Sequence, residues 1–126
     1  MNSPLPPTVL IDDDPDVLAS LGEVFRAWPC PRIVCHESPF EAGADAREAG
    51  LVVCDYRFPG ASGVEWIRGL RGNGCRTPVL LLSGSPDHGA VLEASGLDAC
   101  CFLAKPFSLD QLAGALRGLL RSLETQ

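Results

Sequence analysis

The fold of this 126-residue chain is decided by the stretch Leu51-Val52-Val53-Cys54-Asp55. Four apolar residues in a row end in an acid. An uninterrupted run of this length is typical of a strand that is covered on both faces in a parallel sheet. Four other runs have the same character: Thr8–Ile11, Arg32–Cys35, Pro78–Leu82 and Cys101–Ala104. We therefore expect five buried parallel strands.

Segments with helix-start signals separate these runs. Ser-x-x-Glu and Ser-x-x-Gln are capping boxes, and a Pro at the first helical position also favours a helix start. The five predicted starts are Asp14-Pro15, Ser38-Pro39-Phe40-Glu41, Ser62-Gly63-Val64-Glu65, Ser85-Pro86 and Ser108-Leu109-Asp110-Gln111. The first helix carries an apolar stripe made of Val17, Leu18, Leu21, Val24, Phe25 and Trp28. Strands and helices that alternate five times, joined by right-handed crossovers, predict one doubly wound α/β domain.

Composition excludes several classes of protein. The formal net charge of -6 argues against a general nucleic-acid-binding surface, which needs clustered Lys and Arg. No apolar run is long enough to cross a bilayer, and the segment 1–8 lacks the features of a signal peptide. Six cysteines show no metal-binding spacing: Cys30, Cys35, Cys54, Cys75, Cys100 and Cys101. We interpret them as buried thiols of a cytoplasmic protein.

Polar residues follow four of the predicted strands. Asp12 and Asp13 follow the first, Asp55 ends the third, and Ser83 and Lys105 follow the fourth and fifth. Functional groups of open α/β sheets lie beyond the carboxyl ends of the strands. Neighbouring carboxylates about 4 Å apart repel by roughly 4 kcal/mol at a dielectric constant near 20, so such a cluster needs a cation, and oxygen ligands suit Mg²⁺. The predicted chemistry is phosphoryl capture on Asp55.

Four motifs in order resemble the response-regulator receiver family, in its chemotaxis-regulator-like fold: Leu10-Ile11-Asp12-Asp13-Asp14-Pro15, Val52-Val53-Cys54-Asp55-Tyr56-Arg57-Phe58-Pro59-Gly60, Leu81-Leu82-Ser83-Gly84 and Leu103-Ala104-Lys105-Pro106-Phe107. The resemblance implies a flavodoxin-like strand order 2-1-3-4-5. It also implies a receiver domain over residues 8–124, after a short N-terminal extension, 1–7. The Phe102–Ser108 ending is similar to receivers attached to hybrid sensor kinases.

The resemblance also implies roles for individual residues. Asp55 would be the phosphoacceptor, and Asp12, Asp13, Asp55 and the backbone carbonyl of Arg57 would hold Mg²⁺. Ser83 and Lys105 would contact the phosphoryl group. The Lys105–Pro106 peptide bond is expected to be cis. Ser83 and Phe102 would be the switch residues that change the helix 4–strand 5–helix 5 face. We assign Asp14 no metal role, because an N-cap before Pro15 explains it.

Implied partners are a sensor histidine kinase or histidine phosphotransfer protein and an unknown downstream protein, with a weak homodimer as a further expectation. The sequence departs from the family pattern at two places. Arg57 stands beside the phosphoryl position. The fourth helix is expected to be short, with a longer link into the fifth strand, because Gly96 comes early. The two histidines, His36 and His88, are interpreted as incidental.

Other functions remain open on the sequence. An aspartate-nucleophile phosphatase would carry a second acid two residues after the nucleophile, where this chain has Arg57. A pseudo-receiver would bind proteins without phosphorylation, but would be expected to lack Asp13, Asp55 or Lys105. A nucleotide-binding protein would carry a Gly-rich loop after the first strand, and none is present.

Overall fold

The computed structural model describes residues 6–26, 32–58 and 60–124. The strands are β1 Thr8–Ile11, β2 Ile33–His36, β3 Leu51–Asp55, β4 Arg57–Phe58, β5 Ala61–Ser62, β6 Val79–Ser83 and β7 Cys100–Ala104. The helices are α1 Pro15–Arg26, α2 Pro39–Glu48, α3 Gly63–Gly72, α4 Asp87–Ser95 and α5 Leu109–Glu124. Each predicted strand is present within two residues of its expected bounds.

A five-stranded parallel sheet forms the centre of the molecule, in the order β2-β1-β3-β6-β7. Counted along the chain without the short β4 and β5, this is the order 2-1-3-4-5, so the predicted doubly wound fold is confirmed. Val53 of β3 pairs with Leu10 on one side and with Leu80 on the other. The decisive apolar run is therefore the central strand of the sheet, which explains why it has no polar alternation.

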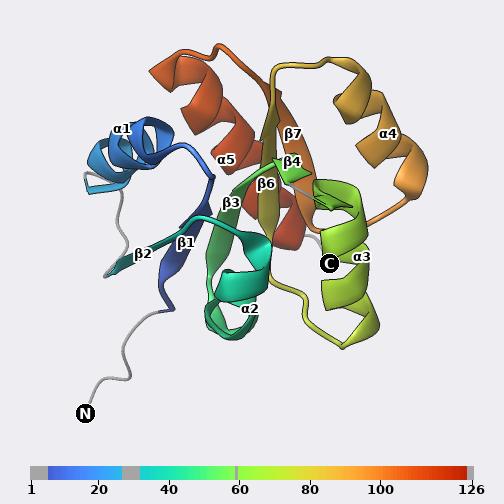
Figure 1. Ribbon diagram of the computed structural model, residues 1–126. Coiled ribbons are helices and arrows are strands. Elements are labelled where there is room, and N and C mark those ends of the chain that lie inside the picture. The colour runs from blue at the N-terminus through green and yellow to red at the C-terminus, as the bar shows by residue number, and fades with distance from the viewer. Residues whose placement is uncertain (1–5, 27–31, 59, 125–126) are drawn as a thin grey trace.

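Helices cover both faces of the sheet (Figure 1). Alternate strand residues point to opposite faces, so β3 contributes Val52 and Cys54 to one core and Val53 to the other. The first core also contains buried residues of α2, α3 and α4, and the second those of α1 and α5. The stripe predicted on α1 faces the second core through Leu21 and Phe25, while its last member, Trp28, lies outside the described residues.

The three predicted capping boxes all have the expected serine cap. The hydroxyl oxygens of Ser38, Ser62 and Ser108 accept the backbone N–H of the residue three positions later. At α5 the box is reciprocal, because the Gln111 side chain accepts the N–H of Ser108 at 2.7 Å. Helix α4 differs: Pro86 occupies the cap position, with no side-chain cap.

Helix α4 is short, as expected, and ends where Gly96 adopts a left-handed conformation with φ 71°. The link into β7 is residues 96–99, because Cys100 already belongs to the strand. The strand therefore begins one residue earlier than predicted, and the comparatively long link stays a prediction. Arg71 at the end of α3 ties this link down by donating to the carbonyls of Asp98 and Ala99.

A two-stranded antiparallel unit, β4 with β5, was not anticipated from the sequence. Gly60, with φ 82°, lies in its turn, a conformation that disfavours other residues. Next to it, Gly63 donates its N–H to the Tyr56 carbonyl at 2.6 Å. A Cβ on Gly63 would lie 2.7 Å from Leu81 Cδ2 and 3.3 Å from the backbone Cα of Tyr56, so any other residue here would force its neighbours to shift.

The cysteines are less uniformly buried than expected. Cys54 and Cys75 are buried, whereas Cys35 on the edge strand β2 is exposed, so the interpretation of Cys35 as buried was wrong. Burial raises the pKa of the Cys54 thiol well above its usual value, with the Asp55 charge adding to the rise. Cys30 lies outside the described residues. Among the helices that the structure describes, none is long and apolar enough to span a membrane.

Candidate functional site

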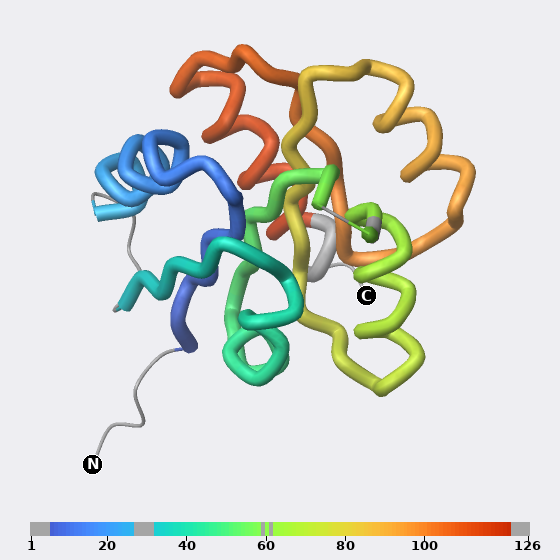
Figure 2. The backbone as a smooth tube through the Cα atoms, viewed as in Figure 1, coloured from blue at the N-terminus to red at the C-terminus, as the bar shows by residue number. Residues whose placement is uncertain are grey.

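Four strand ends meet at one edge of the sheet and carry the residues predicted from the sequence. The chain leaves the upper ends of β6 and β7 toward opposite sides, to α4 and to α5 (Figure 2). Functional groups of open α/β sheets lie beyond these carboxyl ends of the strands. Asp12 directly follows β1, Asp55 ends β3, Ser83 ends β6 and Lys105 directly follows β7. The parallel register therefore brings together residues that are up to 93 positions apart.

The Lys105 ammonium lies between two carboxylates. Its Nζ is 3.4 Å from Asp12 Oδ2 and 3.7 Å from Asp55 Oδ2. The Asp12 side chain is only 2% exposed and that of Asp55 18%, so the pairing operates in a partly desolvated setting where charges interact more strongly than in water. The Lys105–Pro106 peptide bond is cis, as expected.

Three carboxylates could hold a metal ion at this edge. Oxygen atoms of Asp12, Asp13 and Asp55 all lie within 4.8 Å of one another. Burial raises the pKa of Asp12, and the charge of Asp55 adds to the rise, while the Asp14 backbone N–H and Lys105 oppose it. A cluster of carboxylate oxygens with one exposed member fits a hard cation such as Mg²⁺.

Asp14 is not part of this cluster. Its carboxylate accepts the N–H of Asp16 at 2.9 Å, at the start of α1. The prediction that Asp14 caps α1 is therefore confirmed. Its own N–H donates to Asp12 Oδ1 at 2.9 Å, which holds the buried carboxylate in place.

Both histidines, which the sequence interpretation treated as incidental, have side-chain partners. His36 Nε2 lies 2.7 Å from Asp45 Oδ2. His88 Nδ1 lies 2.6 Å from Ser83 Oγ, and its ring stacks on Tyr56 with the ring centroids 3.9 Å apart. The available signal for His88 was its position five residues after Ser83, at the start of the next helix, which keeps it beside the strand end.

Phe102, the predicted switch aromatic, is partly buried on β7 and packs against the core that α4 covers. The Phe102 ring lies close against Gly89 of α4. A Cβ on Gly89 would lie 2.8 Å from Phe102 Cδ2, so a larger residue there would have to displace the ring. The first turn of α4 therefore contacts Phe102 through Gly89 and Ser83 through His88.

A pocket of about 410 Å³ opens at this edge. Its lining consists of Asp55, Arg57, Ser83, Gly84, Ser85, His88 and Lys105. The exposed side chain of Arg57 thus borders the same space as the carboxylate of Asp55. A nucleophilic carboxylate, two cationic side chains and a hydroxyl around one pocket are suited to bind and react with a phosphoryl group.

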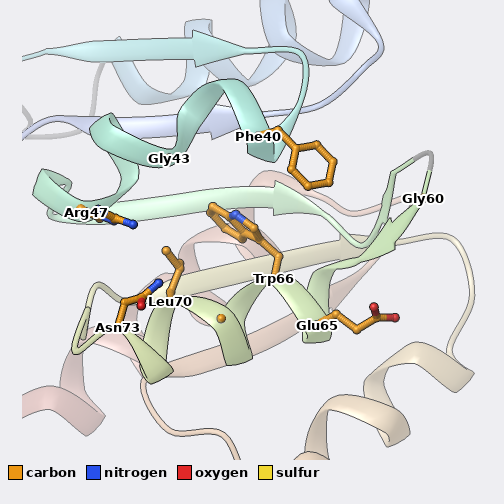
Figure 3. A pocket seen from close by; sticks show the side chains of 9 residues that line it. Phe40, Gly43, Arg47, Gly60, Glu65, Trp66, Leu70 and Asn73 are labelled. Atoms are coloured by element: carbon orange, nitrogen blue, oxygen red, sulfur yellow. The ribbon is translucent and has the colours of Figure 1, made fainter.

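Two other hollows lie nearby. One of about 610 Å³ lies between α1 and α5; Lys105, Phe107 and Leu109 are among its lining residues. The other, of about 420 Å³, lies between α2 and α3, where Phe40, Trp66 and Leu70 are among its lining residues (Figure 3). The strand-end residues contribute only to the first.

Comparison with known proteins agrees with this architecture. The profile of the family described as the response regulator receiver domain matches residues 8–117. Similar curated proteins include the transcriptional regulatory protein FixJ of Azorhizobium caulinodans, 34% identical over 94% of this chain and 57% of FixJ. The response regulator protein TodT of Pseudomonas putida is 30% identical over 89% of this chain and 50% of TodT. The chain spans about half the length of these relatives.

Solved structures show the same fold. A response regulator receiver domain protein from Clostridium thermocellum superposes with a TM-score of 0.79 at 18% identity, covering 96% of this chain and 98% of the other. The chemotaxis response regulator CheY4 of Vibrio cholerae superposes with a TM-score of 0.75 at 21% identity, covering 91% of this chain and 98% of CheY4. The chain belongs to the response regulator receiver domain family, whose members are phosphoacceptor signalling domains rather than enzymes in the usual sense.

Proposed function

We propose that this domain, over residues 8–124, is a phosphorylation switch in which Asp55 accepts a phosphoryl group from a phosphohistidine of a sensor histidine kinase or histidine phosphotransfer protein. The observation that carries the proposal is the placement of Lys105 within 4 Å of both Asp12 and Asp55 at the mouth of a pocket. A fixed cation beside a nucleophilic carboxylate stabilises charge on an incoming phosphoryl group.

In the proposed reaction an Asp55 carboxylate oxygen attacks phosphorus. The new P–O bond forms as the P–N bond to the donor imidazole breaks, and the released imidazole nitrogen takes a proton from solvent. Lys105 pairs with phosphoryl oxygens, and the Ser83 hydroxyl donates to one of them. Asp12, Asp13, Asp55 and the backbone carbonyl of Arg57 would hold Mg²⁺, which supplies positive charge to both carboxylates and phosphate.

Water returns the switch to its resting state by hydrolysing the acyl phosphate to inorganic phosphate and the Asp55 carboxylate. Because Arg57 borders the pocket, we propose that its guanidinium pairs with the phosphoryl oxygens and lengthens the lifetime of the mark. The half-life of phospho-Asp55 should therefore fall in Arg57→Ala. An unchanged or longer half-life in the variant would refute this role.

The output would be a changed α4–β7–α5 face. The contact of Phe102 with Gly89 of α4 supports this, because a movement of the ring on β7 would be felt by the helix. We propose a cytoplasmic protein that signals to a downstream protein partner, with weak self-association at this face and no nucleic-acid or membrane contact by this domain.

The phosphodonor protein would dock over the apolar hollow between α1 and α5. That hollow shares Lys105 with the site, so a protein bound there reaches Asp55. Leu109 at its rim is 66% exposed, although it is a large apolar side chain. Burying this exposed apolar side chain under a partner would stabilise the complex.

The test is incubation with acetyl phosphate and Mg²⁺, followed by intact-mass measurement, with Asp55→Asn as control. A single phosphoryl adduct that needs Mg²⁺ and is absent from the variant is the expected result. Absence of an adduct from acetyl phosphate and from a second small donor, together with no binding of beryllofluoride, would overturn the proposal. The domain would then be a phosphorylation-independent pseudo-receiver that binds proteins.

A further inference from the structure

Ser83 has two hydrogen-bond partners around its hydroxyl oxygen. The backbone N–H of Ser85 donates to Ser83 Oγ at 3.1 Å, and His88 Nδ1 lies 2.6 Å from the same oxygen. The Ser83 side chain is buried, while the imidazole is half-buried at the pocket wall. The environment of the hydroxyl is therefore defined by the chain on two sides.

The direction of the bond between Ser83 and His88 follows from the partners of the hydroxyl. The backbone N–H of Ser85 can only donate, so it leaves the hydroxyl hydrogen of Ser83 without an acceptor. Among the described residues, the partner of Ser83 Oγ that can accept is His88 Nδ1, and a buried hydroxyl hydrogen without an acceptor costs free energy. Ser83 is therefore assigned as the donor and His88 Nδ1 as the acceptor.

Tyr56 holds the imidazole in position. The two rings stack with a 3.9 Å separation of their centroids and an angle of 9° between their planes. Tyr56 is buried, and its N–H donates to the Leu82 carbonyl at 2.8 Å, so the residue that supports His88 is hydrogen-bonded to strand β6 directly after the end of β3. The stacking on Tyr56 therefore restricts the orientation of the imidazole and the position of Nδ1.

We propose that His88 is a positioning residue that holds the Ser83 hydroxyl hydrogen in the resting site, so that phosphorylation of Asp55 must break this bond. The inference deepens the proposed function and rests on it. A serine hydroxyl has one hydrogen and cannot donate to His88 and to a phosphoryl oxygen at once. The bond to His88 therefore competes with the phosphoryl group and sets the resting balance of the switch.

The first turn of α4 transmits the change. When Ser83 leaves His88, the imidazole loses its partner, and the adjacent Gly89 lies against the ring of Phe102. Release of the bond therefore frees the segment that touches both predicted switch residues. His88 makes the position of α4 depend on the hydrogen-bonding state of Ser83.

Two substitutions separate the hydrogen bond from the stacking. His88→Phe keeps a flat ring for Tyr56 and removes the acceptor. His88→Asn removes the ring but keeps an acceptor, because Asn Oδ1 is two bonds from Cβ, as Nδ1 is in histidine. The measurement is the dissociation constant of beryllofluoride, a phosphoryl mimic, at fixed Mg²⁺, made on wild type, both variants, Ser83→Ala and the Ser83→Ala/His88→Phe double variant.

We expect His88→Phe to bind beryllofluoride about fivefold more tightly than wild type, because a net hydrogen bond of about 1 kcal/mol no longer has to be broken. His88→Asn should stay within about twofold of wild type. In the Ser83→Ala background, His88→Phe should have no effect, because no hydroxyl remains to be released. An unchanged or weaker constant for His88→Phe, or a gain that persists without Ser83, would overturn the inference.

A measurement on the unaltered protein tests the same bond. The nitrogen-15 shift of His88 Nδ1 should report an unprotonated, hydrogen-bonded nitrogen in the free protein and a changed environment after beryllofluoride is added. A protonated Nδ1 in the free protein at neutral pH would overturn the inference. If wild type forms no adduct and binds no beryllofluoride, the proposed function fails as well; if wild type binds and the variants match it, only the role of His88 fails.

Discussion

Arg71 is expected to carry an unusually large share of stability for a residue of its type. Its guanidinium donates to the carbonyls of Cys75, Asp98 and Ala99 at 3.0–3.3 Å and pairs with the Asp98 carboxylate at 3.6 Å. Only 8% of its side chain is exposed. Ala99 is a non-glycine residue with φ 53°, a strained conformation that costs about 1–2 kcal/mol and that these bonds help to hold.

The magnitude follows from the bonds that the variant loses. Arg71→Met keeps the length of the side chain and its helix preference but removes the guanidinium. Hydrogen bonds that involve a charged group contribute about 1.5–3 kcal/mol each, but the Ala99 carbonyl keeps the N–H of Val79 as a partner. The loss therefore falls on the carbonyls of Cys75 and Asp98. Loss of two such contributions at the lower end of the range lowers the free energy of unfolding by about 3 kcal/mol, and the melting temperature by roughly 10 °C.

A matched control is available at the same acid. Arg76 also pairs with Asp98, at 2.9 Å, but its side chain is 70% exposed. Exposed ion pairs contribute about 0–1 kcal/mol, so Arg76→Met should lower the free energy of unfolding by about 0.5 kcal/mol. Urea unfolding followed by circular dichroism measures both variants under the same conditions.

The reasoning would be refuted if Arg71→Met lost no more stability than Arg76→Met. It would also fail if Arg71→Met no longer formed the Asp55 adduct at a temperature where it is folded. Arg71 holds the chain that enters the sheet at the amino ends of β6 and β7, whereas Asp55 lies at the carboxyl end of β3. Stability and phosphorylation should therefore respond separately.

Two further predictions use matched pairs of residues. Leu109→Ser should slow phosphoryl transfer from a phosphohistidine protein about tenfold and leave transfer from acetyl phosphate unchanged, because only a protein donor covers the apolar hollow. Phe40 is the control, because its side chain is 69% exposed and that of Leu109 66%. Phe40→Ser should change neither rate, and equal effects of the two variants would contradict the docking site. Gly89→Ala should destabilise the protein by about 1 kcal/mol, because the added methyl would lie 2.8 Å from a ring carbon of Phe102. Gly114→Ala on α5, with open space around it, should instead stabilise by about 0.5–1 kcal/mol, and thermal unfolding in which both variants shift the same way would contradict this account.

Most of the fold could be predicted from the sequence because its signals are local. A continuous apolar run indicates a covered strand wherever it stands, and a serine three residues before a glutamate or glutamine caps a helix through contacts within one turn. The carboxyl-edge rule then predicted which side chains would meet: Asp12, Asp55, Ser83 and Lys105. Asp12 directly follows β1 and Asp55 is the last residue of β3, so the path of the chain alone brings both acids to the same edge.

The tertiary structure decided the features that depend on how elements pack. His88 and Ser83 are neighbours because α4 lies with its first turn over the end of β6, and no periodicity in the sequence states that orientation. Gly89 and Phe102 meet through the packing of α4 on β7, and Arg71 reaches a link 27 residues away. Such contacts depend on angles and distances between elements, which apolar patterns constrain only to a face. The residues proposed here to tune the switch were therefore visible only after the helices were placed.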